Sequence, residues 1–593
     1  MQHHALILED IVKQPGFKLL AMLALFAAPI SAAAQNGGPC PRFAAGSTAV
    51  NPPNLFSKDG TLSVDLSYNT QQDDEGRTLY CFTTRNGTES PTLHIRPGDH
   101  LVIHVKNNLP TPTDPSGMMM TTNAADVCGA STMNSASVNI HYHGTNTAPH
   151  CHQDEVIHTL INAGETFTYD VAFPKSEPPG LYWYHPHVHG ISEMAVQGGA
   201  SGAIVVDGIA DVQPAVKGLP QRIFVIRDQV VAGNPPDDNP SVPAWDLSLN
   251  YIPISWPLEV PAVINMAPKE KQFWRVANAS ADTILDLQVL YDGFPQFLKL
   301  VAIDGVPVGS QDGTVRGKLI QVSHFLLPPA SRVEFILVGP TRQVRRAQFL
   351  TLAVNTGPDG DNDPRRVIAK IKTTNAQAET ADIIEEAKSS AEPTVSGISK
   401  VSPIQRFAGL KAAPVTARRK LYFSEKNAED KFFITVVGQK PELFSPDNPP
   451  AITTTQGSVE DWTIENRSRE NHEFHLHQTH FMVLSQNNFQ LNGSQPVPAL
   501  EGQLVDMINI PFWDGLPNHP FPSVKVRVDF RGPDIGDFVY HCHILEHEDL
   551  GMMAIIRVLP KNSAAAQPSK GRKSVKAKNP TTRALKLVSN ESN

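Results

Sequence analysis

The sequence is poor in long apolar runs, in net positive charge and in helical periodicity. Beyond its first 34 residues, no segment has the ~20 consecutive apolar residues that a membrane-spanning helix needs. The formal net charge of −9 gives no reason to expect a nucleic-acid partner. Long helical repeats are scarce, whereas alternation of apolar and polar residues is common. Together with 50 prolines and 39 glycines, this favours a loop-rich β protein.

The one long apolar run lies near the N-terminus. Lys13 and Lys18 precede apolar residues 19–30, and the small residues 31–34 follow. This order is typical of a cleavable secretory signal, and the run is too short for a membrane anchor. We therefore predict a signal peptide over residues 1–34 and a soluble, exported protein, periplasmic or secreted.

Cysteine is also scarce, with five in 593 residues. Cys542 lies between two histidines, and we assign it to a metal site. The other cysteines are an even set, as expected of disulfides in an oxidising compartment: Cys40, Cys81, Cys128 and Cys151. Four cysteines allow three pairings, and the spacing does not select one. A Cys128–Cys151 bond is one hypothesis, because it would brace the loops around the first histidine motif.

Alternating segments recur along the chain. Residues 101–107, 272–278 and 460–466 are each strand-like and end in Asn, which suits a turn. Their spacing of somewhat under 200 residues predicts three tandem β-sandwich domains. Residues 167–173 and 524–530 are expected to be further strands.

We expect the following organisation after the signal peptide: a first domain over 35–211, a second over 212–373, a linker over 374–403, a third domain over 404–560, and a basic disordered tail over 561–593. Within the linker, residues 381–389 have the composition of a short helix. The middle domain has His324 as its only histidine, so we interpret it as a spacer between the outer domains.

Four His-x-His pairs lie in the outer domains: His141/His143, His185/His187, His475/His477 and His541/His543, with His472 beside the third. Residues 180–187 align without a gap with residues 536–543, and Pro186 stands where the later segment has Cys542. One pair alone is weak evidence for a metal site. Four pairs in two similar domains indicate a shared multi-metal cluster of imidazoles.

The segment around Cys542 points to copper. Side chains on a strand alternate between faces, so His541 and His543 share one face and Cys542 takes the other. His547 and Met552 follow on the cysteine side. A thiolate with imidazoles and a weak thioether is the ligand set of a blue-copper centre. One segment is thus predicted to serve two metal sites.

With these four motifs, the sequence resembles the three-domain multicopper oxidases, among them laccases, ascorbate oxidase and the bacterial copper-efflux and spore-coat oxidases. The resemblance implies an all-β fold of three tandem cupredoxin-like Greek-key sandwiches that hold four coppers. By motif position it implies a type 1 copper on His472, Cys542, His547 and Met552. It implies a type 2 copper on His141 and His475, and a type 3 pair on His143, His185, His187, His477, His541 and His543.

The third motif departs from the common family pattern beside its ligands. Glu473 replaces a usual Pro, and Gln478 and Thr479 replace a usual Gly-His. The resemblance also implies roles for two acids: Glu548 as a proton donor during water formation, and Asp154 as the acid near the type 2 copper. For both, the alternative is a carboxylate that only orients a ligand by hydrogen bonding. Cys542 and its neighbours form the expected electron path between the two sites.

The resulting interpretation is a laccase-like enzyme that oxidises phenols or aromatic amines one electron at a time and reduces O2 to water. The alternatives are a metallo-oxidase for Cu(I), Fe(II) or Mn(II) in copper tolerance, and a non-enzymatic copper-binding protein. A copper nitrite reductase is disfavoured, because such enzymes lack the full set of four pairs.

The remaining chemistry-bearing residues have plainer interpretations. Met118, Met119 and Met120, with Met133, form either a Cu(I) docking loop or an apolar loop that fills gaps. His94 and His104 are expected on the polar face of strands. His189 matches no ligand position of the family.

Overall fold

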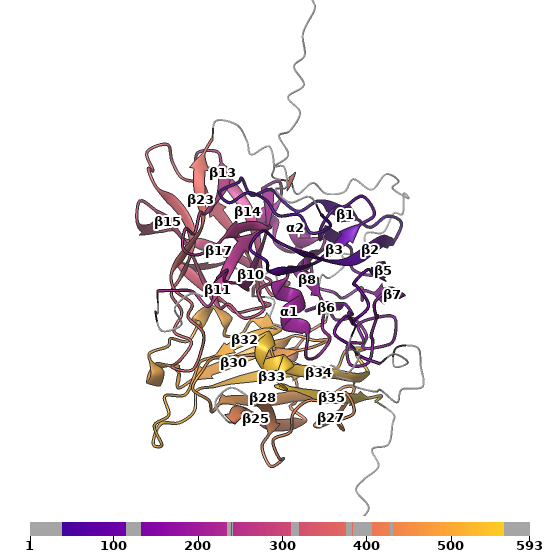
Figure 1. Ribbon diagram of the computed structural model, residues 1–593. Coiled ribbons are helices and arrows are strands. Elements are labelled where there is room, and N and C mark those ends of the chain that lie inside the picture. Colours follow the sequence, from indigo (N-terminus) through magenta and orange to yellow (C-terminus); the bar gives the residue numbers. More distant parts are fainter. Residues whose placement is uncertain are drawn as a thin grey trace, which may run out of the picture.

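The computed structural model describes residues 38–113, 128, 132–233, 239, 241–309, 319–374, 382–383, 406–426 and 431–561. The predicted signal peptide, the Met118–Met120 run and residues 562–593 of the predicted tail lie outside these ranges. The described residues form three tandem cupredoxin-like β-sandwiches, each made of two sheets, as the sequence predicts. In Figure 1 the C-terminal sandwich, coloured orange to yellow, lies below the other two.

The N-terminal sandwich pairs a sheet ordered β1-β4-β9-β8-β6 with one ordered β3-β2-β5-β7. Its strands are β1 (Asn54–Phe56), β2 (Thr61–Gln72), β3 (Thr78–Thr84), β4 (Thr92–Ile95), β5 (His100–Asn107), β6 (His141–His143), β7 (Thr166–Ala172), β8 (Gly180–His185) and β9 (Gly202–Val206). In β2 the apolar residues Leu62, Val64, Leu66 and Tyr68 are buried at every second position, which fixes the face that packs on the core.

The middle sandwich has a large sheet ordered β12-β11-β10-β14-β21-β17-β18, with β19 beside β17 and β24 beside β10. Its second sheet has the order β13-β23-β22-β15-β16, with β20 beside β15. The strands are β10 (Pro220–Val230), β11 (Trp245–Leu249), β12 (Ile252–Ile254), β13 (Ala262–Met266), β14 (Lys271–Asn278), β15 (Leu285–Tyr291), β16 (Phe294–Pro295), β17 (Leu298–Ile303), β18 (Val306–Pro307), β19 (Ile320–Val322), β20 (His324–Leu327), β21 (Arg332–Val338), β22 (Ala347–Leu352), β23 (Arg366–Thr373) and β24 (Asp382–Ile383).

The C-terminal sandwich pairs a sheet ordered β26-β25-β28-β33-β30-β31 with one ordered β27-β35-β34-β29-β32. The strands are β25 (Ala417–Lys426), β26 (Lys431–Val436), β27 (Ile452–Thr455), β28 (Val459–Asn466), β29 (His472–Leu476), β30 (Phe481–Asn487), β31 (Leu504–Val505), β32 (Met507–Ile510), β33 (Ser523–Asp529), β34 (Gly536–Cys542) and β35 (Met553–Leu559).

Helices in the described residues are few and short. They are α1 (Ser192–Gln197), α2 (Ile209–Val212) and α3 (Leu545–Asp549), with 3-10 turns η2 (Pro214–Val216), η3 (Leu410–Ala412), η4 (Phe489–Asn492) and η5 (Pro498–Leu500). In the part of the chain that the structure describes, no helix combines the length and the apolar character needed to cross a membrane.

The three strand-ending asparagines perform the same task in each sandwich. Asn107, Asn278 and Asn466 are fully buried, and each side-chain amide donates to two backbone carbonyls of neighbouring segments. Each side-chain oxygen also accepts from the backbone N–H two residues on. A buried Asn that satisfies loop backbone groups in this way fixes the strand end, which explains the repeated sequence pattern.

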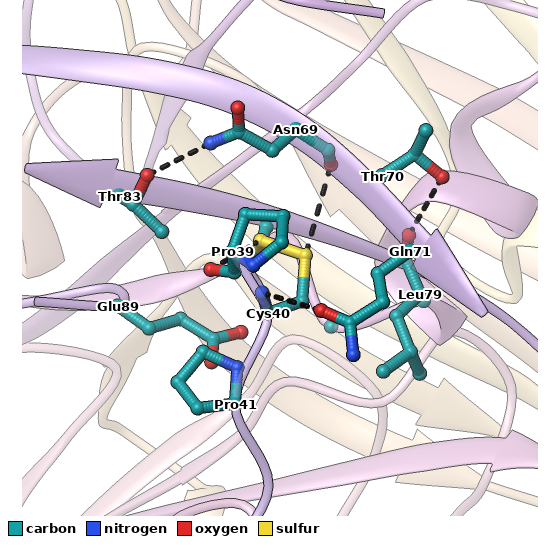
Figure 2. The surroundings of a disulfide bond; sticks show 12 residues. Pro39, Cys40, Pro41, Asn69, Thr70, Gln71, Leu79, Thr83 and Glu89 are labelled. Carbon is teal, nitrogen blue, oxygen red and sulfur yellow. Dashed lines mark hydrogen bonds between the residues drawn. A yellow bond between two sulfur atoms is a disulfide. The ribbon is translucent and has the colours of Figure 1, made fainter. Parts of the chain in front are cut away.

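Two disulfides brace the N-terminal sandwich. Cys128–Cys151 confirms the hypothesis from the sequence, and Cys40–Cys81 is the second bond. Figure 2 shows the chain at Cys40 held against the β2–β3 hairpin, where the Cys40 N–H donates to Gln71 Oε1 (3.1 Å). Across the hairpin, Asn69 Nδ2 donates to Thr83 Oγ1 (2.8 Å). The disulfide therefore ties the start of the described chain to a hydrogen-bonded hairpin.

The structure corrects one expectation from the sequence and describes only part of a second. His94 is buried rather than on a polar face, because β4 lies inside its sheet, and its Nδ1 is 3.0 Å from Asp207 Oδ1. His104 is exposed, as expected. Of the predicted helix 381–389, the structure describes only Asp382–Ile383, which forms strand β24 against β10; the other residues lie outside the described ranges.

Candidate metal centre

The four His-x-His pairs meet between the N-terminal and C-terminal sandwiches. His141 and His143 come from β6, His185 ends β8 and His187 follows it. His475 and His541 come from β29 and β34, and their partners follow. The pairing register explains the meeting, since His141 lies opposite His185 and His475 lies opposite His541 in equivalent antiparallel pairs. All eight side chains are at most 1% exposed, and Figure 1 shows β6 and β8 directly above β34.

The ring nitrogens converge in small groups. Nε2 of His541 lies 3.1 Å from Nε2 of His477 and 3.3 Å from Nε2 of His187, so three acceptor nitrogens face one another. The ring of His143 is 4.9 Å from that of His543 and 5.7 Å from that of His185. Nitrogens this close, with no donor between them, fit a bound cation.

The outer nitrogens of the same rings have partners in the protein. Nδ1 of His185 donates to the Pro186 carbonyl (2.8 Å), Nδ1 of His475 to the Asp506 carbonyl (2.9 Å), and Nδ1 of His541 to the Cys542 carbonyl (2.8 Å). Nδ1 of His141 is 2.9 Å from Asp154 Oδ1. Among the described residues, Nε2 of His141, His185 and His475 is buried without a partner. This is the pattern of metal-binding imidazoles, whose second nitrogen is fixed by the protein.

The protonation state fits as well. Burial lowers the pKa of His141, His143 and His475 well below its usual value, and neighbouring imidazoles add to this. The rings are therefore neutral, which is the form that binds metal. Imidazole ligands suit copper, zinc or iron, so the metal is selected elsewhere in the site.

A second group lies on the other face of β34. Nδ1 of His472 is 3.1 Å from Nδ1 of His547, and these nitrogens lie 3.7 Å and 3.6 Å from Cys542 Sγ. Burial raises the pKa of the Cys542 thiol, so a bound cation is needed to hold the thiolate. Met552 is buried, and its backbone bonds to His547 and Cys542 place it at this group. This donor set selects copper.

The outer nitrogens of these two imidazoles are held by residues that the sequence did not indicate. Nε2 of His472 lies 2.6 Å from Ser468 Oγ and 3.2 Å from Glu425 Oε1. Nε2 of His547 lies 3.3 Å from Glu470 Oε1, and Phe432 stacks on the same ring at 4.3 Å. Ser468 lies only four residues before His472, whereas Glu425, Glu470 and Phe432 are distant in sequence from the imidazoles they contact, so no local motif signals these three.

Asp154 lies against the cluster of eight histidines. Its Oδ1 accepts from the Tyr142 N–H (3.0 Å) and faces His141, while its Oδ2 accepts from Gln478 Nε2 (2.6 Å). Burial raises the pKa of Asp154 to about 8. Gln478, where the family pattern has Gly, has a left-handed φ of 57° and uses its side chain to hold Asp154. Strain of this kind is commonly found at functional sites.

Glu548 is fully buried between two imidazoles of the cluster. Its Oε2 is 2.9 Å from Nδ1 of His541, and its Oε1 is 3.6 Å from Nδ1 of His187. Because the His541 Nδ1–H donates to the Cys542 carbonyl, neither carboxylate oxygen has a directed hydrogen bond among the described residues. Glu548 is thus a buried acid whose two oxygens lack hydrogen-bond donors among the described residues and lie next to the histidines.

The middle sandwich is more than a spacer. Arg332 at the start of β21 forms a buried pair with Asp506 of the C-terminal sandwich, with Nη2 2.6 Å from Oδ2. Asp506 Oδ1 is 3.3 Å from Nε2 of His143. A Cβ at Gly144 would lie 2.2 Å from Arg332 Nη2, so the glycine is needed for this close approach. Arg332 and Asp506 are residues of the candidate site that the sequence analysis missed.

Of two cavities that the C-terminal sandwich helps to line, the smaller borders the Cys542 group. One of about 70 Å³ is lined by His547 and Phe432 and by six carboxylic acids, Asp282, Asp359, Asp361, Asp363, Glu470 and Glu546. A larger cleft of about 900 Å³ lies between the middle and C-terminal sandwiches and includes Asn471, Asn509, Phe297 and Phe489. The small cavity directly reaches a metal-site imidazole.

Comparison with known proteins agrees with this geometry. Multicopper oxidase family profiles match residues 117–210 and residues 414–562. A laccase of Bacillus subtilis (strain 168) is 24% identical over 419 residues, which cover 64% of this chain and 71% of that laccase. The multicopper oxidase mco of Staphylococcus aureus is 36% identical over 129 residues, covering 21% of this chain and 24% of that oxidase.

The chain belongs to the multicopper oxidase family. The fold of this multicopper oxidase is similar to that of a solved structure from Campylobacter jejuni described as a metallo-oxidase. The TM-score is 0.59 at 22% identity, over 90% of this chain and 98% of the other. As a member of the multicopper oxidase family, this protein is a copper-dependent oxidoreductase.

Two further residues of this multicopper oxidase keep their plain interpretations. The His189 ring packs 4.8 Å from the ring of Phe444. Met133 is 2% exposed, which matches a gap-filling role better than an exposed docking loop.

Proposed function

We propose that this chain is a laccase-like multicopper oxidase that couples one-electron oxidation of a small reductant to four-electron reduction of O2 to water. The observation that carries the proposal is the segment His541-Cys542-His543. Its cysteine faces one candidate metal group and its histidines face the other. A protein that merely stored copper would not need the two groups joined through adjacent residues.

The ligand assignments of this proposal follow the geometry and the family resemblance together. His472, Cys542, His547 and Met552 hold the type 1 copper. His141 and His475 hold the type 2 copper, and His143, His185, His187, His477, His541 and His543 hold the type 3 pair. When bound, the four coppers supply one-electron uptake at the cysteine site and four-electron O2 reduction at the histidine cluster.

The chain's own groups then have distinct tasks. Cys542 and its backbone connect the two sites covalently. Glu548, with its unbonded oxygens beside His187 and His541, transfers protons to the cluster. Asp154 orients His141 and Tyr142, which supports an orienting role ahead of proton transfer.

In this proposal the reductant binds where it can approach His547. The sequence favours phenols or aromatic amines, and the 900 Å³ cleft, which shares Asn471 with the small cavity at His547, is large enough for such a ring. The boundaries 35–211, 212–373 and 404–560 remain our proposal for the three domains. Export by the 1–34 signal, to the periplasm or the medium, likewise remains a proposal.

A second candidate, a metallo-oxidase for Cu(I), Fe(II) or Mn(II), is favoured by the small cavity beside His547. Six acids line it, and burial raises the pKa of Asp363 to about 8. Burial and the nearby Glu193 and Asp228 carboxylates raise that of Asp282 well above its usual value. A cation in the cavity would relieve this repulsion, whereas a phenolate would increase it.

Steady-state O2 uptake distinguishes the two candidates. The donors are a methoxyphenol, an aromatic amine, Fe(II) and Cu(I), each tested with Asp359→Asn and with the control Asp447→Asn, which changes an exposed acid away from the cavity. A laccase would oxidise the aromatic donors fastest, and neither substitution would change its rates. A metallo-oxidase oxidises the metal ions fastest and is impaired only by Asp359→Asn. No O2 uptake with any donor would contradict the proposed function.

A further inference from the structure

Glu473 lies where the family pattern has proline, directly after the metal-site residue His472. It belongs to β29, which runs between β32 and β34. Its backbone nitrogen is 3.3 Å from Cys542 Sγ and donates its proton to the sulfur. Its carbonyl accepts from the His543 N–H (2.8 Å). Both backbone groups of Glu473 are therefore engaged with the His541–His543 segment.

The side chain of Glu473 anchors this backbone to β32, the strand on the other side of β29 from β34. Asn509 of β32 is its cross-strand partner, and Asn509 Nδ2 donates to Glu473 Oε1 (2.6 Å). The residue is completely buried. Because β29 is bonded on both sides and the carboxyl is held, the N–H has little freedom to turn away from the sulfur.

Proline has no N–H, so a family member with proline here cannot make this bond. In the present chain the sulfur accepts from two backbone donors, Glu473 and Ile544. The sulfur of the reduced centre carries more negative charge than that of the oxidised centre. Donors aimed at it therefore stabilise the reduced state, and the reduction potential of a blue-copper site is tuned in this way.

We infer that Glu473 is a positioning residue that raises the reduction potential of the Cys542 site through its backbone N–H, with Asn509 holding it in place. The inference rests on the proposed function, because it concerns the copper that Cys542 holds. It makes no use of Glu473 as an acid or base. Glu473 thereby tunes electron uptake at the Cys542 site.

The main experiment compares Glu473→Pro with Glu473→Gln. Proline deletes the N–H, which pairs with the sulfur and not with a strand neighbour, so the β29 ladder keeps its bonds. Glutamine keeps the N–H and an oxygen for Asn509. In copper-loaded protein poised with a one-electron mediator, we expect Glu473→Pro to lower the ratio of reduced to oxidised type 1 centre about tenfold, which is about 59 mV for one electron.

The blue charge-transfer band of Glu473→Pro should also shift to longer wavelength, because the sulfur loses a stabilising donor. Glu473→Gln should match the wild type in both measurements. If Glu473→Pro leaves the ratio within twofold of the wild type, the inference is wrong. If the wild type itself shows no type 1 signal, the proposed function fails first, and the two failures are thereby distinguished.

A second measurement covers the case in which Glu473→Pro does not fold or bind copper. Cell-free synthesis with 15N-glutamate labels the Glu473 nitrogen, and pulsed EPR of the type 1 signal detects a coupled 15N. The Glu473→Gln variant made with the same label is the matched control, since it lacks 15N at this position. We expect a coupling in the wild type that the control lacks, and equal spectra would overturn the inference.

Discussion

Arg332 and Asp506 form a fully buried ion pair across two sandwiches, with 2.6 Å between Nη2 and Oδ2. Asp506 Oδ1 in turn lies 3.3 Å from His143 Nε2, and the Asp506 carbonyl accepts from His475 Nδ1 (2.9 Å). The middle sandwich, which has none of the histidine motifs, thereby contacts the histidine cluster through one carboxylate. We derive from this a role for the middle sandwich in holding the cluster together.

Replacing Arg332 by Gln should destabilise the fold by about 3–5 kcal/mol, because it leaves Asp506 buried and uncompensated. It should also lower copper retention at the eight-histidine cluster, since Asp506 no longer orients His143. The matched control is Arg275→Gln, which breaks a buried pair with Glu334 in the same sheet (3.1 Å). Copper content and EPR spectra would show whether only Arg332→Gln disturbs the cluster; equal disturbance by both would reduce Arg332 to a structural residue.

Cys542→Ser should abolish the blue absorption and leave most copper bound at the other sites. The reason is that Cys542 Sγ lies with His472 and His547, whereas the eight histidines lie across β34. Copper counting beside visible and EPR spectra gives the answer. Loss of all copper in this variant would contradict the two-site account.

Glu548→Gln should leave reduction by the donor nearly intact and slow reoxidation by O2, because an amide cannot cycle a proton. The neighbouring Glu546→Gln is a useful control, since Glu546 lines the small acidic cavity and not the histidine cluster. It should change the KM for a cationic donor without changing reoxidation. Stopped-flow kinetics separate the steps, and unaltered reoxidation of Glu548→Gln at every pH would assign Glu548 a structural role.

Stability should fall as pH rises through the neutral range, with Glu177 as one source. Burial raises its folded-state pKa to about 8 from an ordinary value of 4.5, and its oxygens accept from Asn146. Between these values the unfolded chain releases a proton that the folded chain keeps, so this group's contribution falls by about 1.4 kcal/mol per pH unit.

The test is the apparent Tm of the wild type and Glu177→Gln at pH 5 and pH 8. The two proteins should be close at pH 5, and the variant should be the more stable at pH 8 because it has no proton to lose. A constant difference between the proteins at both pH values would show that the Glu177 carboxyl does not titrate in this window.

The parts of the site that follow strand alternation were predictable. The His-x-His spacing placed both histidines of a pair on one face, and the gapless match of residues 180–187 to 536–543 predicted equivalent strands, which are β8 and β34. The strand endings at Asn107, Asn278 and Asn466 were likewise visible, because a local turn requirement is written in local sequence.

What escaped prediction depends on contacts between distant segments. Arg332 and Asp506 are 174 residues apart, and Glu425 reaches His472 from another sheet. His94 looked like a surface residue because alternation cannot show that β1 and β9 flank its strand on both sides. The departures Glu473 and Gln478 were visible in the sequence, but their partners Cys542, Asn509 and Asp154 were not.

The central claim is that His541, Cys542 and His543 serve two copper sites back to back. An anomalous difference map from crystals of the copper-loaded protein, recorded on either side of the copper absorption edge, tests it most directly. The account predicts one copper peak among His472, Cys542 and His547 and three peaks within the eight-histidine cluster. Absence of a copper peak at Cys542, or a histidine cluster occupied by a single ion, would contradict it.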